Sequence, residues 1–295
     1  MEFFYFAYGL LIRSVFPMPE LSSAEGRPEV VVRLGNVNPP LQGSVKEGEN
    51  FLMTREGVYL FWEHIGKIFV REGRDIIVDP APEVDGGTIR LFILGPALGI
   101  TAHQRGGFVL HGSAVTIHGR TVAFLGGEET GKSTLAAAIY AQGHSVVVDD
   151  VVVVRLDAGC PVVNPGFPYL KLRPKVANAL GDLGQTQQIS YPCVKIRAYP
   201  VKKGFSARPI PLRRIYLLHN SKGQKIEPLK PQEAFIELIK YSYCPRLLSD
   251  GRASLHLLQC ATLVNHIPIF RLNRPRSISS LPDVVRMVEK DLAHE

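Results

Sequence analysis

Short apolar runs separated by turn residues make up the first third of the chain. Aromatic, β-branched and aliphatic side chains fill these runs, and Gly66 and Gly73 mark turns between the last three of them. The pattern predicts a β-rich module without a catalytic constellation, in which Trp62 and His64 are expected to be structural. The runs that we interpret as strands are 2–16, Val30–Leu34, Gly57–Ile65, Lys67–Arg71 and Asp75–Val78.

The apolar positions between Thr88 and Gln104 recur at roughly helical spacing, which predicts an amphipathic helix. Because proline favours the first helical turn, the Gly95–Pro96 pair predicts that the helix begins there rather than at Thr88. The Gly106–Gly107 pair is expected to end it. We therefore place a domain boundary here, with a β-rich N-terminal module over residues 1–105 and a second domain over residues 106–295.

Beyond the boundary, strand and helix patterns alternate, as is typical of an α/β fold. Strands over Phe108–Ile117 and Arg120–Leu125, joined at His118–Gly119, predict a hairpin. The valine-rich run from Ser145 to Val154 predicts a buried strand. The other expected elements are helices over Leu135–Ala141, Lys175–Leu183, Pro231–Tyr243, Ala253–Val264 and Ser280–His294, and strands over Ile215–Leu218 and Ile267–Leu272.

The composition is typical of a folded globular protein, and the net charge favours an anionic partner. The 295 residues are 45% hydrophobic and 21% charged, with a formal net charge of +7. A nucleotide alone accounts for that preference, so the charge does not predict a nucleic-acid partner. There is no signal peptide and no apolar run of about 18–20 residues, so we expect a cytoplasmic protein with no membrane partner. The cysteines are far apart and are expected to be buried, reduced thiols: Cys160, Cys193, Cys244 and Cys260.

The stretch after the predicted hairpin carries the clearest chemistry. It fits the phosphate-loop pattern G-x-x-x-x-G-K-[ST], and a strand precedes it and a helix follows it. Backbone N–H groups and the positive end of the helix dipole can then surround a phosphate, while Lys132 reaches the β- and γ-phosphates and the Ser133 hydroxyl binds Mg²⁺. The alternative is an ordinary glycine turn before a helix. The candidate nucleotide-binding residues are Gly126, Gly127, Glu128, Glu129, Thr130, Gly131, Lys132, Ser133 and Thr134, and the expected cofactors are ATP and Mg²⁺.

Two carboxylates, Asp149 and Asp150, interrupt the valine-rich strand. Burial of an unpaired carboxylate is costly, so a metal ion, a cation or exposure at a strand end or bulge must offset it. Neighbouring residues of a regular strand face opposite sides, so only one of the two can point at the phosphates unless the strand bends. The functional interpretation is a Mg²⁺ ligand or a base beside the γ-phosphate. The alternative is an Asp-Asp turn between two strands, with both side chains in water.

The segment from Leu183 to Ile226 is basic and contains no Asp or Glu. It is a solvated basic surface, a rim that helps to hold phosphates, or a docking surface over residues 195–225 for a peptide or small-protein substrate. Its scattered aromatic residues do not predict a single-stranded nucleic acid as partner. Its basic residues are Lys195, Arg197, Lys202, Lys203, Arg208, Arg213, Arg214, Lys222 and Lys225.

Three motifs resemble those of the HPr kinase/phosphorylase family, whose catalytic domain is distantly similar to phosphoenolpyruvate carboxykinase. They are Leu110-His111-Gly112, the phosphate loop and Val148-Asp149-Asp150, in the same order and at similar spacing. The chain resembles the HPr-kinase-related proteins of bacterial gene clusters more than the regulatory enzyme itself. The resemblance covers most of the chain, and its specific part is residues 108–154.

The resemblance implies ATP-dependent phosphorylation of a serine hydroxyl. It implies that Asp149 is the base that takes the hydroxyl proton and that Asp150 supports the metal or orients His111. His111 would then lie near the transferring phosphate, where the phosphate charge would raise its pKa, and Lys132 completes the catalytic set. Relatives in the regulatory family assemble as hexamers, so the resemblance leaves a homo-oligomer open.

Two features depart from the family pattern. Glu128 and Glu129 occupy loop positions that are usually Gly or Ser, so their side chains must point away from the triphosphate or they repel it. The expected consequence is a weaker ATP affinity or a loop tied to a basic neighbour. The family's downstream signature with a metal-binding Glu is not evident. Mg²⁺ would therefore be held by Ser133 and an Asp, namely Asp150, or another acid would replace that Glu.

The sequence thus predicts an α/β protein that joins a β-rich N-terminal module to a P-loop, HPr-kinase-like catalytic domain. The expected reaction moves the γ-phosphoryl group of ATP to a serine hydroxyl of a peptide or small protein. The alternatives are a small-molecule kinase with the same machinery and a nucleotide-binding regulatory protein without phosphotransfer.

Overall fold

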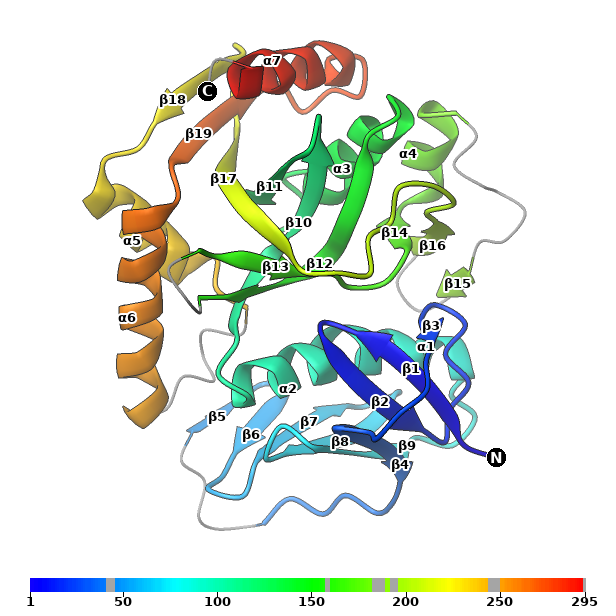
Figure 1. Cartoon of the computed structure of the whole chain (residues 1–295). Coiled ribbons are helices and arrows are strands. Elements are labelled where there is room, and N and C mark those ends of the chain that lie inside the picture. The colour runs from blue at the N-terminus through cyan, green and yellow to red at the C-terminus, as the bar shows by residue number, and fades with distance from the viewer. Residues whose placement is uncertain (41–45, 157–159, 182–188, 192–195, 244–249, 294–295) are drawn as a thin grey trace.

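The described residues of the computed structural model form two large β-sheets, with a helical segment packed between them (Figure 1). The structure describes residues 1–40, 46–156, 160–181, 189–191, 196–243 and 250–293. None of the helices in these ranges is both long enough and apolar enough to cross a membrane.

The N-terminal sheet contains, within the described residues, nine strands in the order β3-β1-β2-β4-β9-β8-β7-β6-β5. Its neighbours pair antiparallel except β2–β4 and β4–β9, which are parallel. Central β4 is anchored by the fully buried Val30 and the nearly fully buried Val32, which alternate with a more exposed residue as a pleated strand requires. The strands are β1 (Phe3–Ala7), β2 (Leu10–Ser14), β3 (Ser22–Ser23), β4 (Val30–Leu34), β5 (Lys46–Gly48), β6 (Phe51–Met53), β7 (Val58–Trp62), β8 (Gly66–Arg71) and β9 (Asp75–Pro80).

The first apolar segment is a hairpin, so the prediction of one strand over residues 2–16 is wrong. β1 and β2 pair antiparallel, with Ala7 opposite Leu10. The two turn residues, Tyr8 (φ 56°) and Gly9 (φ 79°), have the left-handed values that match the twist of the strands. Tertiary contacts hold the aromatic residue in this position, because Tyr8 N–H donates to Pro165 O at 2.8 Å and Tyr8 O accepts from the Asn164 amide at 3.1 Å.

A continuous helical segment covers residues 86–104, so the predicted helix start at Gly95–Pro96 is wrong. It begins as α1 (Gly86–Phe92) after Asp85, whose carboxylate accepts from Thr88 N–H at 2.9 Å and caps the helix. Pro96 lies inside the π-helical turn η1 (Ile93–Ala97), whose altered bonding accommodates the missing N–H before α2 (Leu98–Gln104). The end of the helix is as expected, since Gly106 (φ 84°) follows it.

The second sheet has, in the described part of the chain, seven strands in the order β11-β10-β12-β13-β17-β19-β18. The predicted hairpin is confirmed as β10–β11, and β11 also pairs with β17, which closes five of the strands into a ring. A small sheet, β14-β16-β15, lies beside it. The strands are β10 (Phe108–Ile117), β11 (Arg120–Leu125), β12 (Ser145–Arg155), β13 (Val162–Asn164), β14 (Tyr169–Leu172), β15 (Ile189–Tyr191), β16 (Ile196–Pro200), β17 (Ile210–Asn220), β18 (Lys225–Pro228) and β19 (Ile269–Arg274).

Helices cover this sheet on two sides (Figure 1). α7 packs on α3 through its buried residues Leu281, Val284 and Val288, which lie on one face at helical spacing. α5 and α6 pack on each other near β18 and β19. The helices are α3 (Lys132–Ala141), α4 (Pro174–Ala179), α5 (Pro231–Lys240), α6 (Asp250–His266) and α7 (Leu281–Ala293).

The main hydrophobic core crosses the predicted boundary at residue 105. Ile12 of β2, Leu98 of α2 and Val152 of β12 belong to the same buried cluster. The segment between the two sheets therefore packs on both of them, and the division into 1–105 and 106–295 stays a prediction.

Candidate active site

The phosphate loop connects buried β11 to the start of α3. Its two fixed glycines are required by the backbone: Gly126 has φ 155° and Gly131 has φ 92°. A Cβ atom on Gly126 would lie 2.7 Å from Thr130 Oγ1, and one on Gly131 would lie 2.2 Å from Arg274 Nη2. The loop thus has the tight conformation that the sequence pattern predicts.

The side chain of Lys132 binds backbone carbonyl groups of its own loop. Its buried ammonium donates to Gly126 O and to Gly127 O, both at 2.9 Å. Burial lowers the pKa of Lys132, while the negative charges of Asp149, Asp150 and Glu128 act in the opposite direction. An anion in the loop would offer this ammonium a stronger partner than two neutral carbonyl groups.

Asp149 is almost completely buried on β12, beside the loop. Its carboxylate accepts from the Ser113 hydroxyl at 2.6 Å and from Lys171 N–H at 2.9 Å, and the nearby Ser133 hydroxyl at the start of α3 acts to lower its pKa. Burial raises the pKa of Asp149, and these hydrogen bonds offset the rise only in part. The phosphate loop and this carboxylate therefore form one site.

Asp150 follows with φ 80°, a left-handed value that is rare for a residue in a strand. The backbone change lets both carboxylates contact the same residue, because Lys171 Nζ lies 2.8 Å from Asp150 Oδ2. Burial acts to raise the pKa of Asp150, but the Lys171 ammonium and His111 hold it far below its usual range. β12 continues through both positions, which pair with Ser113 and Gly112 of β10, so the alternative of an Asp-Asp turn is wrong.

His111 is on β10, across from the carboxylate pair. Its Nδ1 lies 3.4 Å from Asp150 Oδ1, and its ring centroid lies 6.1 Å from that of Tyr243. The π-helical turn reaches the same place, since a Cβ atom on Gly95 would be 3.4 Å from Asp150 Oδ2. His111, Asp150, Asp149, Ser133 and Lys132 are thus connected by direct contacts or by charge, as the sequence predicts for one site.

Two residues of this site were not predicted from the sequence: Lys171 and Arg274. Arg274 is the last residue of β19 and is buried. Its guanidinium donates to Thr130 O at 2.7 Å and so supports the loop just before α3 begins. Burial lowers the pKa of Arg274. Lys171 stands alone in the apolar strand Tyr169–Leu172, and a lone basic residue among apolar ones is the signal that could have marked it. Arg274 shares its strand with Arg271 and Asn273, so it carries no such signal.

Glu129 ties the loop to basic neighbours, one of the two arrangements expected for the loop glutamates. Its carboxylate forms ion pairs with Arg173 and with Arg276, the latter at 3.2 Å, and both lower its pKa, Arg276 more strongly. The three side chains are more than half exposed, so water screens the pairs and their contribution to stability is small. The side chain of Glu129 is held by these arginines at the surface.

The basic segment differs from expectation at one residue. Arg214 is 5% exposed, its guanidinium binds Asp291 of α7, and it stacks 4.5 Å from the Phe270 ring centroid. It cannot belong to a docking surface, because it opens the buried run of β17 from residue 214 to residue 218. Neighbouring Arg213 is exposed, as are Lys202, Lys203 and Arg208, while Lys195 lies outside the described residues.

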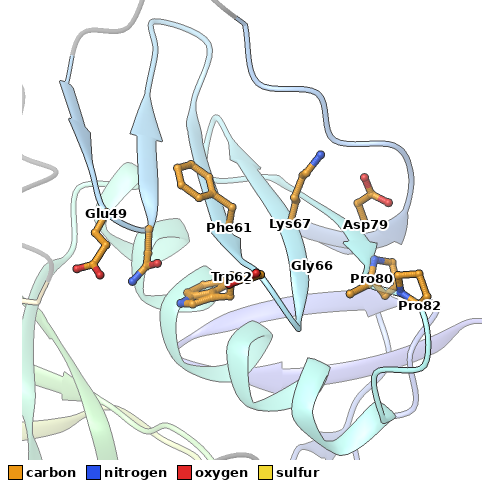
Figure 2. A pocket seen from close by; sticks show the side chains of 11 residues that line it. Glu49, Phe61, Trp62, Gly66, Lys67, Asp79, Pro80 and Pro82 are labelled. Carbon is orange, nitrogen blue, oxygen red and sulfur yellow. The ribbon is translucent and has the colours of Figure 1, made fainter.

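A cavity of about 570 Å³ lies apart from the phosphate loop, on the N-terminal sheet (Figure 2). Phe61, Trp62, Lys67 and Asp79 line it, together with residues from the adjoining turns. The Trp62 ring lies 4.3 Å, centroid to centroid, from Phe92 of α1. Trp62 therefore joins the sheet to the helix and also forms a wall of this cavity.

Both cysteines that can be described are free, but only Cys260 is buried; the expectation of a buried thiol is wrong for Cys160, which is exposed. Cys193 and Cys244 lie outside the described residues. Burial raises the pKa of Cys260 to about 12, so its thiol is unreactive.

Comparison with known proteins gives a likeness of fold only. No protein-family model and no curated protein matches the chain. Among solved structures, the Hpr(Ser) kinase/phosphatase from Coxiella burnetii aligns with a TM-score of 0.36 and 10% identity, over 63% of this chain and 97% of that one. At this TM-score the likeness carries no information on the reaction.

Proposed function

We propose that the chain is an ATP-dependent phosphotransferase that moves the γ-phosphoryl group to a serine hydroxyl of a peptide or small protein. The observation that supports this most is the carboxylate pair of β12 beside the loop, since Asp149 is buried near Ser133 and Lys132 while Asp150 contacts Lys171 and His111. A nucleotide clamp needs only the loop, whereas phosphoryl transfer also needs groups that orient the acceptor and neutralise charge.

The residues present fit a magnesium–nucleotide complex. Hydroxyl and carboxylate oxygens are the donors that Mg²⁺ prefers, and Ser133 and Asp149 bring both kinds together at the start of α3. We expect Ser133 and the carboxylate pair, including Asp150, to hold the ion, which would neutralise charge on the phosphates. The loop N–H groups would bind the phosphates, and Lys132 would exchange its loop carbonyls for phosphate oxygens.

The two carboxylates would have different roles because their surroundings differ. The raised pKa of Asp149 makes it the better proton acceptor, so we assign it as the base for the serine hydroxyl. Lys171 keeps Asp150 ionised, which suits a residue that orients His111 and adds negative charge near the ion. His111 would then face the transferring phosphate.

The experiment compares Asp149→Asn with the wild type in two assays. Calorimetry with ATP and Mg²⁺ measures binding, and mass spectrometry of a cell extract treated with the protein and γ-labelled ATP detects the phosphorylated product. We expect Asp149→Asn to lower transfer by about 10²–10⁴-fold while ATP binding changes little. Asp283→Asn, an exposed position on α7, is the matched control and should leave both unchanged.

Each of the other outcomes supports a different assignment of the residues or a different function. If Asp150→Asn abolishes transfer and Asp149→Asn does not, the two carboxylates exchange roles. Tight ATP binding without any phosphorylated product identifies a nucleotide-binding regulatory protein, and a phosphorylated metabolite in place of a peptide identifies a small-molecule kinase.

A further inference from the structure

A group of side chains of the types that ligate metals lies at the other end of the β10–β11 hairpin from the phosphate loop. It consists of His118 in the hairpin turn, His144 just after α3, and Glu289 on α7. Glu289 Oε1 is 2.7 Å from His144 Nε2 and 3.9 Å from His118 Nε2, and the three ligand atoms all lie within 4.8 Å of one another.

Three separate elements place these side chains together. His118 has φ 47° in the tight turn of the hairpin, and its ring stands edge-on to that of His144 at 4.9 Å between centroids. His144 follows the C-terminal stop of α3, and its side chain is only 10% exposed. Because β11 carries six residues from the turn to the loop, about 20 Å of strand separates this group from Gly126.

The carboxylate of Glu289 contacts the two imidazoles. Within the described residues, its ion-pair contacts are with His118 and His144. Three arginines around α7 bind other groups: Arg120 binds Leu292 O, Arg214 binds Asp291 and Arg286 binds Asp283. A divalent cation held between the three ligand atoms would compensate the charge of the carboxylate.

We propose that His118, His144 and Glu289 bind a zinc ion or a similar transition metal. Two imidazole nitrogens and one carboxylate oxygen form a donor set suited to zinc and unsuited to Mg²⁺, which takes oxygen ligands. Zinc bonds of about 2.0–2.2 Å hold their ligand atoms roughly 3–4 Å apart, close to the present spacing, and leave a fourth position for water. The ion joins the hairpin turn, the end of α3 and α7, so it fastens α7 to the helix that begins at the phosphate loop.

Zinc binding by the full chain tests the proposal independently of ATP chemistry. The chelator-treated protein is dialysed against Zn²⁺ in excess Mg²⁺, which occupies oxygen-rich sites, and bound zinc is measured by mass spectrometry of the metal. The same protein titrated with Co²⁺ reports the donor set through visible absorption bands. We expect one zinc per chain and an affinity that falls at least about tenfold in His118→Ala and in Glu289→Gln.

The variants and controls separate metal binding from folding. The His118 side chain is 69% exposed, so His118→Ala should keep its circular dichroism spectrum and lose only the zinc-dependent rise in melting temperature. His64→Ala, an exposed histidine on the N-terminal sheet, should bind zinc as the wild type does. The proposal is overturned if the wild type retains no zinc, or if His118→Ala and Glu289→Gln bind it as tightly as His64→Ala.

Discussion

Replacing Lys171 by Met tests whether the charge of Asp150 is set by this lysine. The substitution keeps a long apolar stem and removes the ammonium that lies 2.8 Å from Asp150 Oδ2. His111 at 3.4 Å then remains as the basic partner of the carboxylate. Asp149 keeps its bond from the backbone N–H of residue 171, so the change acts mainly on Asp150.

The expected loss of stability follows from the exposure of the pair. Removing one partner of a fully buried ion pair costs about 3–5 kcal/mol. The Lys171 side chain is 7% exposed and that of Asp150 is 27% exposed, so water reaches one side of the carboxylate. We therefore expect the free energy of unfolding to fall by about 2–3 kcal/mol at pH 7, measured by urea denaturation.

The pH dependence gives the sign of the effect. In the wild type the pKa of Asp150 is lowered on folding, so its contribution is fully present above the unfolded value of about 3.9 and is lost as the pH falls through the folded value. In Lys171→Met burial dominates and raises that pKa, so the deficit is largest at neutral pH. Below the raised pKa each pH unit should recover about 1.4 kcal/mol relative to the wild type.

Two controls test whether Lys171 stabilises the protein through its charge on Asp150. Lys175→Met makes the same change at an exposed position of α4 and should cost less than about 0.5 kcal/mol. In an Asp150→Asn background, where Asn tolerates φ 80°, Lys171→Met should cost at least about 1 kcal/mol less than it does alone. An equal cost in both backgrounds, or a deficit that does not shrink in acid, refutes the assigned pairing.

Two further predictions concern the loop and the basic segment. Gly131→Ala should weaken ATP binding at least about tenfold in a calorimetric titration, because φ 92° is strained for alanine and its Cβ would lie 2.2 Å from Arg274 Nη2. Gly127→Ala is the control: its Cβ would meet nothing closer than 3.8 Å, so this variant should bind ATP nearly normally. Arg214→Ala should lower the free energy of unfolding by about 2–4 kcal/mol, because it leaves Asp291 without its guanidinium. Arg213→Ala should leave stability unchanged and, if a peptide docks on this surface, raise the KM for the peptide but not for ATP.

The sequence predicted elements whose signals are local and missed those that depend on distant contacts. The phosphate loop was predicted because the chain itself enforces it: the glycines are required by φ at Gly126 and Gly131, and the flanking strand and helix are continuous. The hairpin at Tyr8 was missed because its turn is held by Pro165 and Asn164, more than 150 residues away. The start of the helix over 86–104 was misplaced because a π-helical turn accommodates Pro96 inside the helix, where the usual rule puts proline in the first turn.

The same distinction separates the predicted from the unpredicted residues of the site. Asp149 and Asp150 stood out because two carboxylates in a valine-rich strand create an electrostatic cost that something must offset. Lys171, on another strand, offsets this cost by contacting both carboxylates. The left-handed backbone at Asp150 allows this contact, and no pattern of alternating side chains predicts such a backbone change. Likewise, the sequence shows that Glu129 needs a basic neighbour, and only the fold brings Arg173 and Arg276 to it. The basic residues that set the charges of this site thus come from distant parts of the chain and are placed there by the tertiary structure. For this reason Lys171→Met tests the site more sharply than a change within the loop.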